Sequence, residues 1–491
     1  MLSVYLGNYH RSVNHMRGEG INSRLIVIGI VVIFTTLFGW LLFGNPSYDP
    51  YLRVPGMDNR PKGLGENDSV MIGEFFETFN SSVTKTSGSW PRFRGSNYDN
   101  ISTDPTPTAD SWPAEGPPEL WRVPLGEGHA APSIYDGKVY ILDYDEKKRA
   151  DALRCFSLET GEELWKRWYH VAIKRNHGMS RTIPTVTDKY IISMGPRCHV
   201  MCLDRVSGDL LWTLDPVRDF GAEIPQWYTA QCPLVENDIA IIALGGTELL
   251  VGIECSTGRI IWETPNPDAW KMSHSSVLPA TIHGKKMYIY MAVGGVCGVS
   301  AEGDDIGKVL WKTSEWSPTV VATSPLYLGN NQILVTTGYG AGGGRINIEK
   351  DETGFSASVT EIHTPKEGLS SEQQTPLRTG EYIWTINPKD AGAMRNQLTC
   401  YHRSDLRTPV WSSGKESRFG LGPYMVVGDK LFLLNDDSEL FMYRLGTGSA
   451  TLIGNHRILD DGADAWGPLA FADGFLLLRD SRIMVCIDAR K

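Results

Sequence analysis

The chain has 491 residues and a formal net charge of −10 at pH 7. No run of more than three basic residues follows residue 90, which argues against nucleic acid as a partner, because a surface that binds it needs a basic face. The length is far more than a single small domain requires.

The first predicted element is a membrane-spanning helix over residues 24–44. The run from Arg24 to Phe43 is apolar after its first residue and about long enough to cross a bilayer. A cleaved signal peptide is the alternative. The bulky end of the run, and the lack of a small-residue cleavage site directly after it, favour a helix that is retained.

Basic residues flank this run on one side only. Arg11, Arg17 and Arg24 precede it, and the next basic residue is Arg53. The positive-inside rule therefore places the N-terminus in the cytoplasm and the rest of the chain outside. The expected parts are a cytoplasmic tail (1–23), a transmembrane anchor (24–44), a linker with an amphipathic helix (45–89) and a repeat domain (90–491).

The linker has two halves of different composition. Residues 45–65 are rich in Pro, Gly and Asn, whereas residues 68–83 show an apolar spacing that suits an amphipathic helix. The stripe of this helix would consist of Val70, Phe75, Phe79 and Val83. We expect the helix to pack on the domain that follows; a contact with the membrane or with a partner is the alternative.

A sequence repeat of about 50 residues fills the remainder of the chain. Eight prolines recur at intervals of 45 to 52 residues, and each opens a short apolar run. They are Pro132, Pro184, Pro233, Pro279, Pro325, Pro376, Pro423 and Pro468. A repeat of this length built from short strands predicts an all-β fold, an eight-bladed β-propeller.

Tryptophan marks the last strand of most repeats. In four repeats a glycine turn is followed four residues later by tryptophan, so that the indole can pack one sheet against the next. The structural tryptophans of the repeat are Trp121, Trp165, Trp212, Trp262, Trp311 and Trp411. The first of them lies before the first proline, and the last repeat has no tryptophan strand. We therefore expect Leu120–Val123 to pair with Val485–Asp488 and to close the ring.

These motifs resemble the pyrroloquinoline-quinone (PQQ) repeat. Glu159-Thr-Gly161-Glu-Glu-Leu-Trp165 matches closely, and Trp90-Pro-Arg-Phe-Arg-Gly95 looks like the W-P-x-F-R-G segment that begins bacterial PQQ-like propeller proteins. The resemblance covers about residues 90–491. Together with the predicted anchor and its flanking arginines, it leads us to expect a bacterial protein of the inner membrane with its propeller in the periplasm. The superfamily holds quinoprotein alcohol and glucose dehydrogenases, and also non-catalytic propellers such as the lipoprotein of the outer-membrane β-barrel assembly machine.

Two further motifs are expected to be structural. Cys155, Cys202, Cys400 and Cys486 fall at similar places in their repeats and predict small buried core residues. Residues four apart on a strand, such as Cys198 and Cys202, lie roughly 13 Å apart, too far for a disulfide or a shared metal. We expect no metal site there. The glycine-rich stretch Gly338–Gly344 predicts a blade loop rather than a nucleotide site, because Arg345–Ile348 looks like a strand and not a helix.

Polar residues just before the innermost strands are the candidate ligand site. Because these strands converge on the axis, His129, Arg181, Gln231, His274, Gln374 and Trp466 should gather at one mouth of the channel. Arg181 is positively charged, the two histidines could add charge below about pH 6.5, and Trp466 could stack on a planar group. A small anionic ligand or a partner's carboxylate is the expected occupant. The alternative is that these groups cap strands and line a wet channel.

No catalytic residue is identified. By the resemblance, a quinoprotein dehydrogenase would need two adjacent cysteines and a calcium ion held by Glu, Asn and Asp. The chain has no Cys-Cys pair and no haem or hydrolase motif, and no local motif joins the possible donors Asp464, Asp480 and Asn396. We therefore expect a propeller that binds or scaffolds a protein partner or a small ligand, with no cofactor. The alternative is a PQQ- and Ca²⁺-dependent or other periplasmic oxidoreductase.

Overall fold

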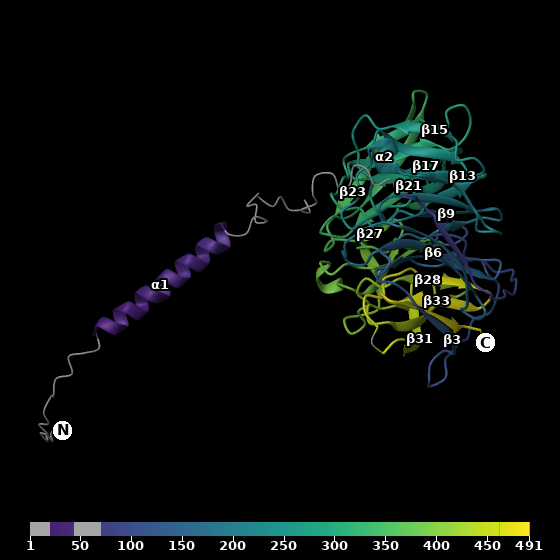
Figure 1. The fold of residues 1–491 in the computed structure, drawn as a ribbon. Coiled ribbons are helices and arrows are strands. Elements are labelled where there is room, and N and C mark those ends of the chain that lie inside the picture. Colours follow the sequence, from purple (N-terminus) through teal and green to yellow (C-terminus); the bar gives the residue numbers. More distant parts are fainter. Residues whose placement is uncertain (1–19, 44–69, 461, 491) are drawn as a thin grey trace, which may run out of the picture. The chain divides into compact units, whose positions relative to one another are not determined.

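The computed structural model describes residues 20–43, 70–460 and 462–490 (Figure 1). The chain divides into two compact units, Met1–Ser69 and Val70–Lys491. In the first unit, α1 (Gly20–Phe43) is a 24-residue helix. No helix within the described residues is both long enough and apolar enough to cross a membrane. The anchor over 24–44 stays a prediction, and the expected linker over 45–65 lies outside the described residues.

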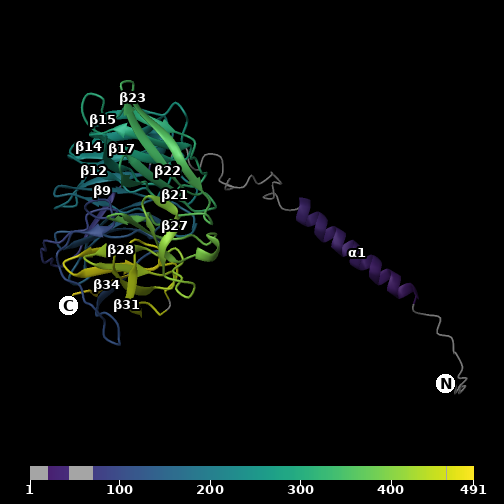
Figure 2. The ribbon, with the colours of Figure 1, turned by 180° about the vertical axis from the view of Figure 1, so that it is seen from behind.

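In the second unit, the described residues form eight sheets that follow one another along the chain (Figures 1 and 2). The strands of blades 1 to 4, in chain order, are β4 (Ser133–Tyr135), β5 (Lys138–Asp145), β6 (Ala150–Ser157), β7 (Glu163–His170); β8 (Thr185–Val186), β9 (Tyr190–Met194), β10 (Val200–Asp204), β11 (Leu210–Leu214); β12 (Leu234–Glu236), β13 (Ile239–Ala243), β14 (Glu248–Glu254), β15 (Ile260–Pro265); and β16 (Leu278–Ile282), β17 (Lys285–Ala292), β18 (Gly295–Ser300), β19 (Val309–Thr313). A short helix, α2 (Pro216–Phe220), connects blades 2 and 3.

The strands of blades 5 to 8 are β20 (Leu326–Gly329), β21 (Gln332–Thr337), β22 (Gly342–Asp351), β23 (Gly354–His363); β24 (Leu377–Thr379), β25 (Tyr382–Ile386), β26 (Leu398–His402), β27 (Asp405–Ser412); β28 (Tyr424–Val427), β29 (Lys430–Leu434), β30 (Glu439–Leu445), β31 (Ala450–Arg457); and β32 (Ala470–Ala472), β33 (Phe475–Arg479), β34 (Ile483–Asp488), with β3 (Glu119–Pro124). A 3₁₀ turn, η1 (Gly392–Met394), lies in blade 6. The green hairpin β22–β23 extends blade 5 (Figure 2). The eight-bladed β-propeller is thereby confirmed.

The first strand of each blade is short and lies innermost. β4 contacts its counterparts β8 and β32 in the neighbouring blades. Seven of the eight repeated prolines precede such a strand, because proline at that point fixes φ without removing a needed ladder donor. Blade 4 differs: Pro279 lies inside β16 and pairs with Tyr288, and Val277 occupies the place of the proline.

The ring is closed by a strand from before the first blade. β3 pairs antiparallel with β34, and Trp121 lies opposite Cys486 and Val123 opposite Met484. The prediction of a latched ring is confirmed. Blade 8 therefore joins the two ends of the repeat domain and leaves β34 with a partner on both sides.

The hydrophobic core lies between blades, and the repeated tryptophans contribute to it. Trp121 of blade 8 packs on the turn of blade 1, where a Cβ at Gly161 would lie 2.6 Å from the indole. Trp212 packs in the same way on Gly258. Trp121, Trp165, Trp262 and Trp311 are buried, whereas Trp212 and Trp411 are half-buried. The cysteines expected in the core are buried there.

The N-terminal segment of this unit wraps blade 1, and the helix expected over 68–83 is wrong for residues 70–83. Phe75–Thr78 instead form strand β1, which adds to the outer edge of β7. Phe75 stacks on Trp168 at 4.2 Å between ring centroids. The two faces of this edge strand are both half-buried: Phe75 stacks on Trp168, and Phe76 packs against Trp165 on the other face.

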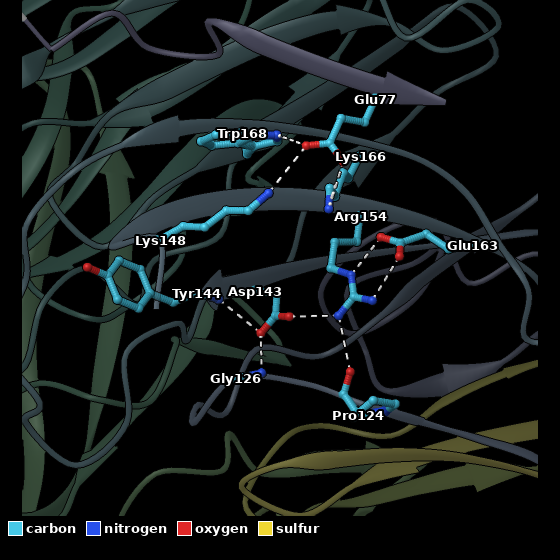
Figure 3. A network of polar contacts seen from close by, with 10 residues as sticks. All are labelled: Glu77, Pro124, Gly126, Asp143, Tyr144, Lys148, Arg154, Glu163, Lys166 and Trp168. Atoms are coloured by element: carbon cyan, nitrogen blue, oxygen red, sulfur yellow. Dashed lines mark hydrogen bonds and ion pairs between the residues drawn. The ribbon is translucent and has the colours of Figure 1, made fainter. Parts of the chain in front are cut away.

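Polar contacts fix β1 and blade 1 in place (Figure 3). Glu77 of β1 accepts a hydrogen bond from Trp168 Nε1 at 2.7 Å and forms ion pairs with Lys166 and Lys148. On the neighbouring strands, Arg154 bridges the carboxylates of Asp143 and Glu163 at 2.9 and 2.7 Å. Glu77, Lys148, Lys166, Arg154, Asp143 and Glu163 therefore each have a partner of opposite sign.

Candidate functional site

A cavity of about 380 Å³ lies at the end of the axis where the innermost strands begin. All eight blades contribute to its wall. Five of the six residues predicted at the channel mouth line it: His129, Arg181, His274, Gln374 and Trp466. The positions of the repeated prolines therefore predict where the cavity lies. Ligand binding by these residues stays a prediction.

Gln231 does not line the cavity. Its side-chain amide is buried and bonds to its own blade: Nε2 donates to Ala243 O at 2.6 Å, and Oε1 accepts from Ala243 N at 3.1 Å. Thr182 and Thr323, at the matching position of blades 2 and 5, also donate to the backbone of their own blades. The residue one step earlier faces the cavity, because side chains alternate along extended backbone. In blade 3 that residue is Ala230.

Arg181 brings a positive charge to the cavity wall. Its guanidinium donates to the carbonyl oxygens of Asn176, His177, Gly178 and Trp227. Among the described residues no carboxylate forms an ion pair with it. Burial lowers its pKa to about 10, so the group is still charged at neutral pH. Backbone dipoles fix its direction without cancelling its charge.

His129 and His274 line the cavity in the neutral form. Burial, followed by the positive charges of Arg479 and Arg181, lowers the pKa of His129 to about 3. Burial and Arg181 lower the pKa of His274 to about 4. The expectation that both would gain charge below about pH 6.5 is wrong. That value is the pKa of an exposed imidazole, and it includes neither the effect of burial nor that of the neighbouring arginines. Within the described residues, neither Nδ1 atom has a hydrogen-bond partner.

Aromatic rings cover the cavity wall beside these groups. His129 lies 4.8 Å from Trp466 between ring centroids, and Trp227 stacks on Tyr339 at 5.4 Å with 18° between the planes. Trp227 belongs to the connection between blades 2 and 3, and Tyr339 to the turn before β22. The first four residues of the glycine-rich stretch form this turn, as expected, and Gly342–Gly344 begin β22.

Sequence reasoning missed several cavity residues that do not precede an innermost strand. They are Phe93, Trp227, Tyr339 and Lys389. Phe93 belongs to the W-P-x-F-R-G segment, which was itself a usable signal. The long turns that carry the other three have no repeat register, so position along the repeat could not place them.

Glu372 is the acidic side chain that the described residues bring to the cavity wall. It is buried, and burial raises its pKa against the opposing effect of Lys389, whose Nζ lies 3.6 Å from Glu372 Oε1. This pair is close to neutral as a unit. Arg181 therefore remains as the uncompensated charge of the wall.

The donor set of a calcium–quinone site does not meet at this cavity. Asp464 is exposed, and Asp480 accepts hydrogen bonds from the backbone N–H groups of Arg482 and Ile483. Neither they nor Asn396 line the cavity. Across the described ranges, no three His, Cys, Asp or Glu side chains group in a way that could hold a metal. All eight cysteines are free thiols. These residues do not fit that cofactor.

Known proteins of similar fold are found among solved structures. BamB from Moraxella catarrhalis is 11% identical, with 75% of this chain and 97% of that chain covered and a TM-score of 0.48. A europium-containing methanol dehydrogenase is 9% identical, with 81% and 90% covered and a TM-score of 0.43. The quinohemoprotein alcohol dehydrogenase from Comamonas testosteroni is 12% identical, with 82% and 81% covered and a TM-score of 0.42. No curated protein matches the sequence significantly.

A family model gives the assignment. The model described as outer membrane protein assembly factor BamB matches residues 149–413, which is more than half of the chain. The matched part runs from blade 1 to blade 6 and contains the glycine–tryptophan turns. The chain thus belongs to the PQQ-like β-propeller family.

Proposed function

We propose that this protein is a binding propeller that holds an anionic group in the cavity at the mouth of its channel. The anion belongs to a small ligand or to a carboxylate of a protein partner, and no catalytic step is required. The observation that carries the proposal is Arg181, a half-buried cation on the wall whose hydrogen-bond partners in the described residues are backbone carbonyls. A carboxylate of the chain itself beside this guanidinium would have neutralised the charge and left none for a ligand.

The dimensions and chemistry of the cavity support this function. Its volume of about 380 Å³ lies in the range of small-molecule sites, which are mostly apolar with a few fixed polar groups. The aromatic rings exclude water, and the low dielectric strengthens the attraction of Arg181 for an anion. Charge-assisted hydrogen bonds to such a cation are about twice as strong as neutral ones. The family description, an assembly factor, is in keeping with a protein partner.

The location of the protein in the cell is part of the same proposal. The apolar run Arg24–Phe43 and the arginines before it support a single-pass anchor in a bacterial inner membrane, with the propeller in the periplasm. A cavity that opens to the periplasm would meet soluble anions and extended segments of passing proteins there.

The charge of the cavity can be tested without knowledge of the ligand. Ala230 lines the cavity and is half-buried, and the native cysteines are all buried. In full-length Ala230→Cys, we expect a sulfonate-bearing methanethiosulfonate to react faster than the trimethylammonium reagent. Adding Arg181→Gln should lower the ratio of the two rates on the order of tenfold, because one unit charge is removed. Arg181→Lys should keep the ratio.

A matched control is Arg418→Gln, which removes an arginine outside the cavity. It should leave the ratio unchanged. A ratio that does not respond to Arg181→Gln in a folded protein would contradict the proposal. A thermal-shift screen of the full chain against anionic metabolites, with Arg181→Gln alongside, then identifies the ligand class.

Binding of the cofactor distinguishes the oxidoreductase alternative from the binding propeller. A tight one-to-one complex in the absorbance spectrum after PQQ and Ca²⁺ are added would favour it, because the spectrum of the bound quinone differs from that of the free one. No binding, together with a positive result in the charge test, supports the binding propeller.

A further inference from the structure

The segment before the first blade is bonded to the innermost strands and reaches the cavity. Residues 90–102 are here called the plug. Trp90 exchanges backbone hydrogen bonds with Ile134 of β4, each at 2.9 Å. At the other end, β2 (Ile101–Ser102) pairs in parallel with β28 of blade 7. The plug is therefore held by blade 1 at one end and by blade 7 at the other.

The middle of the plug is fixed by a buried arginine. Arg94 donates to the carbonyl oxygens of Thr375 and Pro376 at 2.9 and 3.0 Å and to Tyr98 O at 2.8 Å. The carbonyl of Pro91 accepts from Val186 N at 2.8 Å. Each end of this stretch is thereby bonded to a different blade. The residue between these anchors, Phe93, has little freedom to move along the axis.

The glycine that ends the W-P-x-F-R-G segment is required by the backbone conformation at that position. Gly95 has φ +76, and a Cβ there would lie 2.7 Å from the ring of Trp90. The turn brings the backbone over the indole, which only glycine allows. The segment therefore folds back at Gly95 and leaves Phe93 at its crest.

Phe93 forms the floor of the cavity. It lines the cavity, and on its other side it packs against Ala131, Ile183 and Cys232, the residues directly before the innermost strands of blades 1 to 3. Ser276, which comes before the innermost strand of blade 4, also lines the cavity, and its Oγ accepts from Cys232 N at 2.9 Å. The cavity lining is thus apolar at Phe93 and Ile183, with the hydroxyl of Ser276 beside Cys232.

We propose that Phe93 is the specificity-determining residue of the cavity and that its ring sets the length of the anion that fits beneath Arg181. The apolar end of the ligand rests on Phe93 while its anionic group meets Arg181. The inference rests on the proposed function, since it specifies the ligand of that same site. Phe93 is half-exposed, and it lines the cavity, so its ring is available to a ligand there.

Cys232 offers a readout that needs no ligand. It lines the cavity beside Phe93, is 6% exposed, and burial raises its pKa to about 12. Its thiol is therefore slow to react in the native protein. In full-length Phe93→Ala, methyl methanethiosulfonate should modify Cys232 at least about tenfold faster, measured by peptide mass spectrometry, because the floor is removed. Phe93→Leu should give an intermediate rate and covers the case in which the alanine variant is unstable.

The length preference is measured with benzoate, phenylacetate, 3-phenylpropionate and 4-phenylbutyrate as probes in thermal shift. We expect the best-bound acid to be longer in Phe93→Ala than in the wild type. Phe79→Ala, which removes an exposed phenylalanine from the same N-terminal segment, should change neither readout.

The outcomes separate the two proposals. Binding that depends on Arg181 but has the same length preference and the same Cys232 rate in folded Phe93→Ala and Phe93→Leu overturns the role of Phe93 alone. If no acid binds the wild type and the charge test at Ala230→Cys is also negative, the proposed function fails and this inference fails with it. A longer preferred acid together with faster modification of Cys232 supports it.

Discussion

Single buried polar residues set how this protein responds to pH. Asp151 is fully buried and accepts a hydrogen bond from Tyr169 Oη at 3.0 Å, and His199 Nδ1 lies 3.1 Å from that same hydroxyl. Burial raises the pKa of Asp151 from 3.8 to about 7, and the bond from Tyr169 opposes the rise. This carboxyl is therefore half-protonated near neutral pH.

Replacement of Asp151 tests that assignment. Because its folded-state pKa lies above its unfolded value, the folded state binds the extra proton between about pH 4 and pH 7. Stability is highest at the acid end of that window and falls as the pH rises through it. The stability of Asp151→Asn relative to the wild type should therefore rise from about pH 4 to pH 7, on the order of 1.4 kcal/mol per pH unit, and level off above pH 7. Melting temperatures at four pH values measure this; the exposed Asp188→Asn is the control. Parallel profiles would contradict it.

The tryptophans of the repeat should differ in how much each contributes to the free energy of unfolding. Trp262 and Trp311 are buried, and Trp262→Ala should cost about 3–5 kcal/mol of unfolding free energy. Trp212 is half-buried, and its Nε1 donates to Cys255 O at 2.8 Å, so Trp212→Ala should cost less. Urea denaturation of the two variants compares them. Equal losses would show that burial does not set the order.

At the scale of elements, the latch strand β3 is the most consequential, since it supplies the outer strand of blade 8. Deletion of residues 119–124 should leave the edge of β34 unpaired, and aggregation should follow because free edges template pairing between chains. Size-exclusion chromatography and melting temperature measure this outcome. A deletion variant that stays monomeric with an unchanged melting temperature would show that the latch is dispensable.

Elements also show what the sequence could predict. The repeat period predicted the blades, the latch and five cavity residues, because each blade repeats the same step along the chain. The register was one step wrong at Gln231, since a period of 45 to 52 residues does not resolve the alternation of side chains. Trp227 and Tyr339 lie in turns of unequal length, which carry no period. β1 was misassigned because a four-residue edge strand depends on the partner strand β7, far away in sequence.

At the scale of the whole molecule, the eight thiols are expected to be inert. All are free and buried, and burial raises the pKa of Cys155 and Cys486 strongly. A reductant should leave the melting temperature unchanged, and Ellman's reagent should find fewer than about one thiol in the native protein. In denaturant it should find all eight. A drop in melting temperature with reductant would reveal a disulfide.

The anchor is the other prediction at this scale. If Arg24–Phe43 is retained, N-terminal sequencing of the mature protein should return residues before Arg24, and the protein should stay in the membrane fraction after a carbonate wash. A mature chain that starts after Gly44 would show that the run is a cleaved signal peptide. Substitution of Arg17 and Arg24 by glutamate is the control for orientation.

The pairing of β3 with β34 has a consequence for biosynthesis. Residues near 119 must wait for residues near 487 before their strand has a partner. At a synthesis rate of 5–20 residues per second, that interval is roughly 20 to 70 s. During that time blades 1 to 7 exist as an open arc whose two ends cannot yet meet, and the early strand hangs free. A chain that leaves the ribosome in this state needs protection from pairing with other chains, so the vulnerable period of this protein is set by its topology and ends only with its last strand.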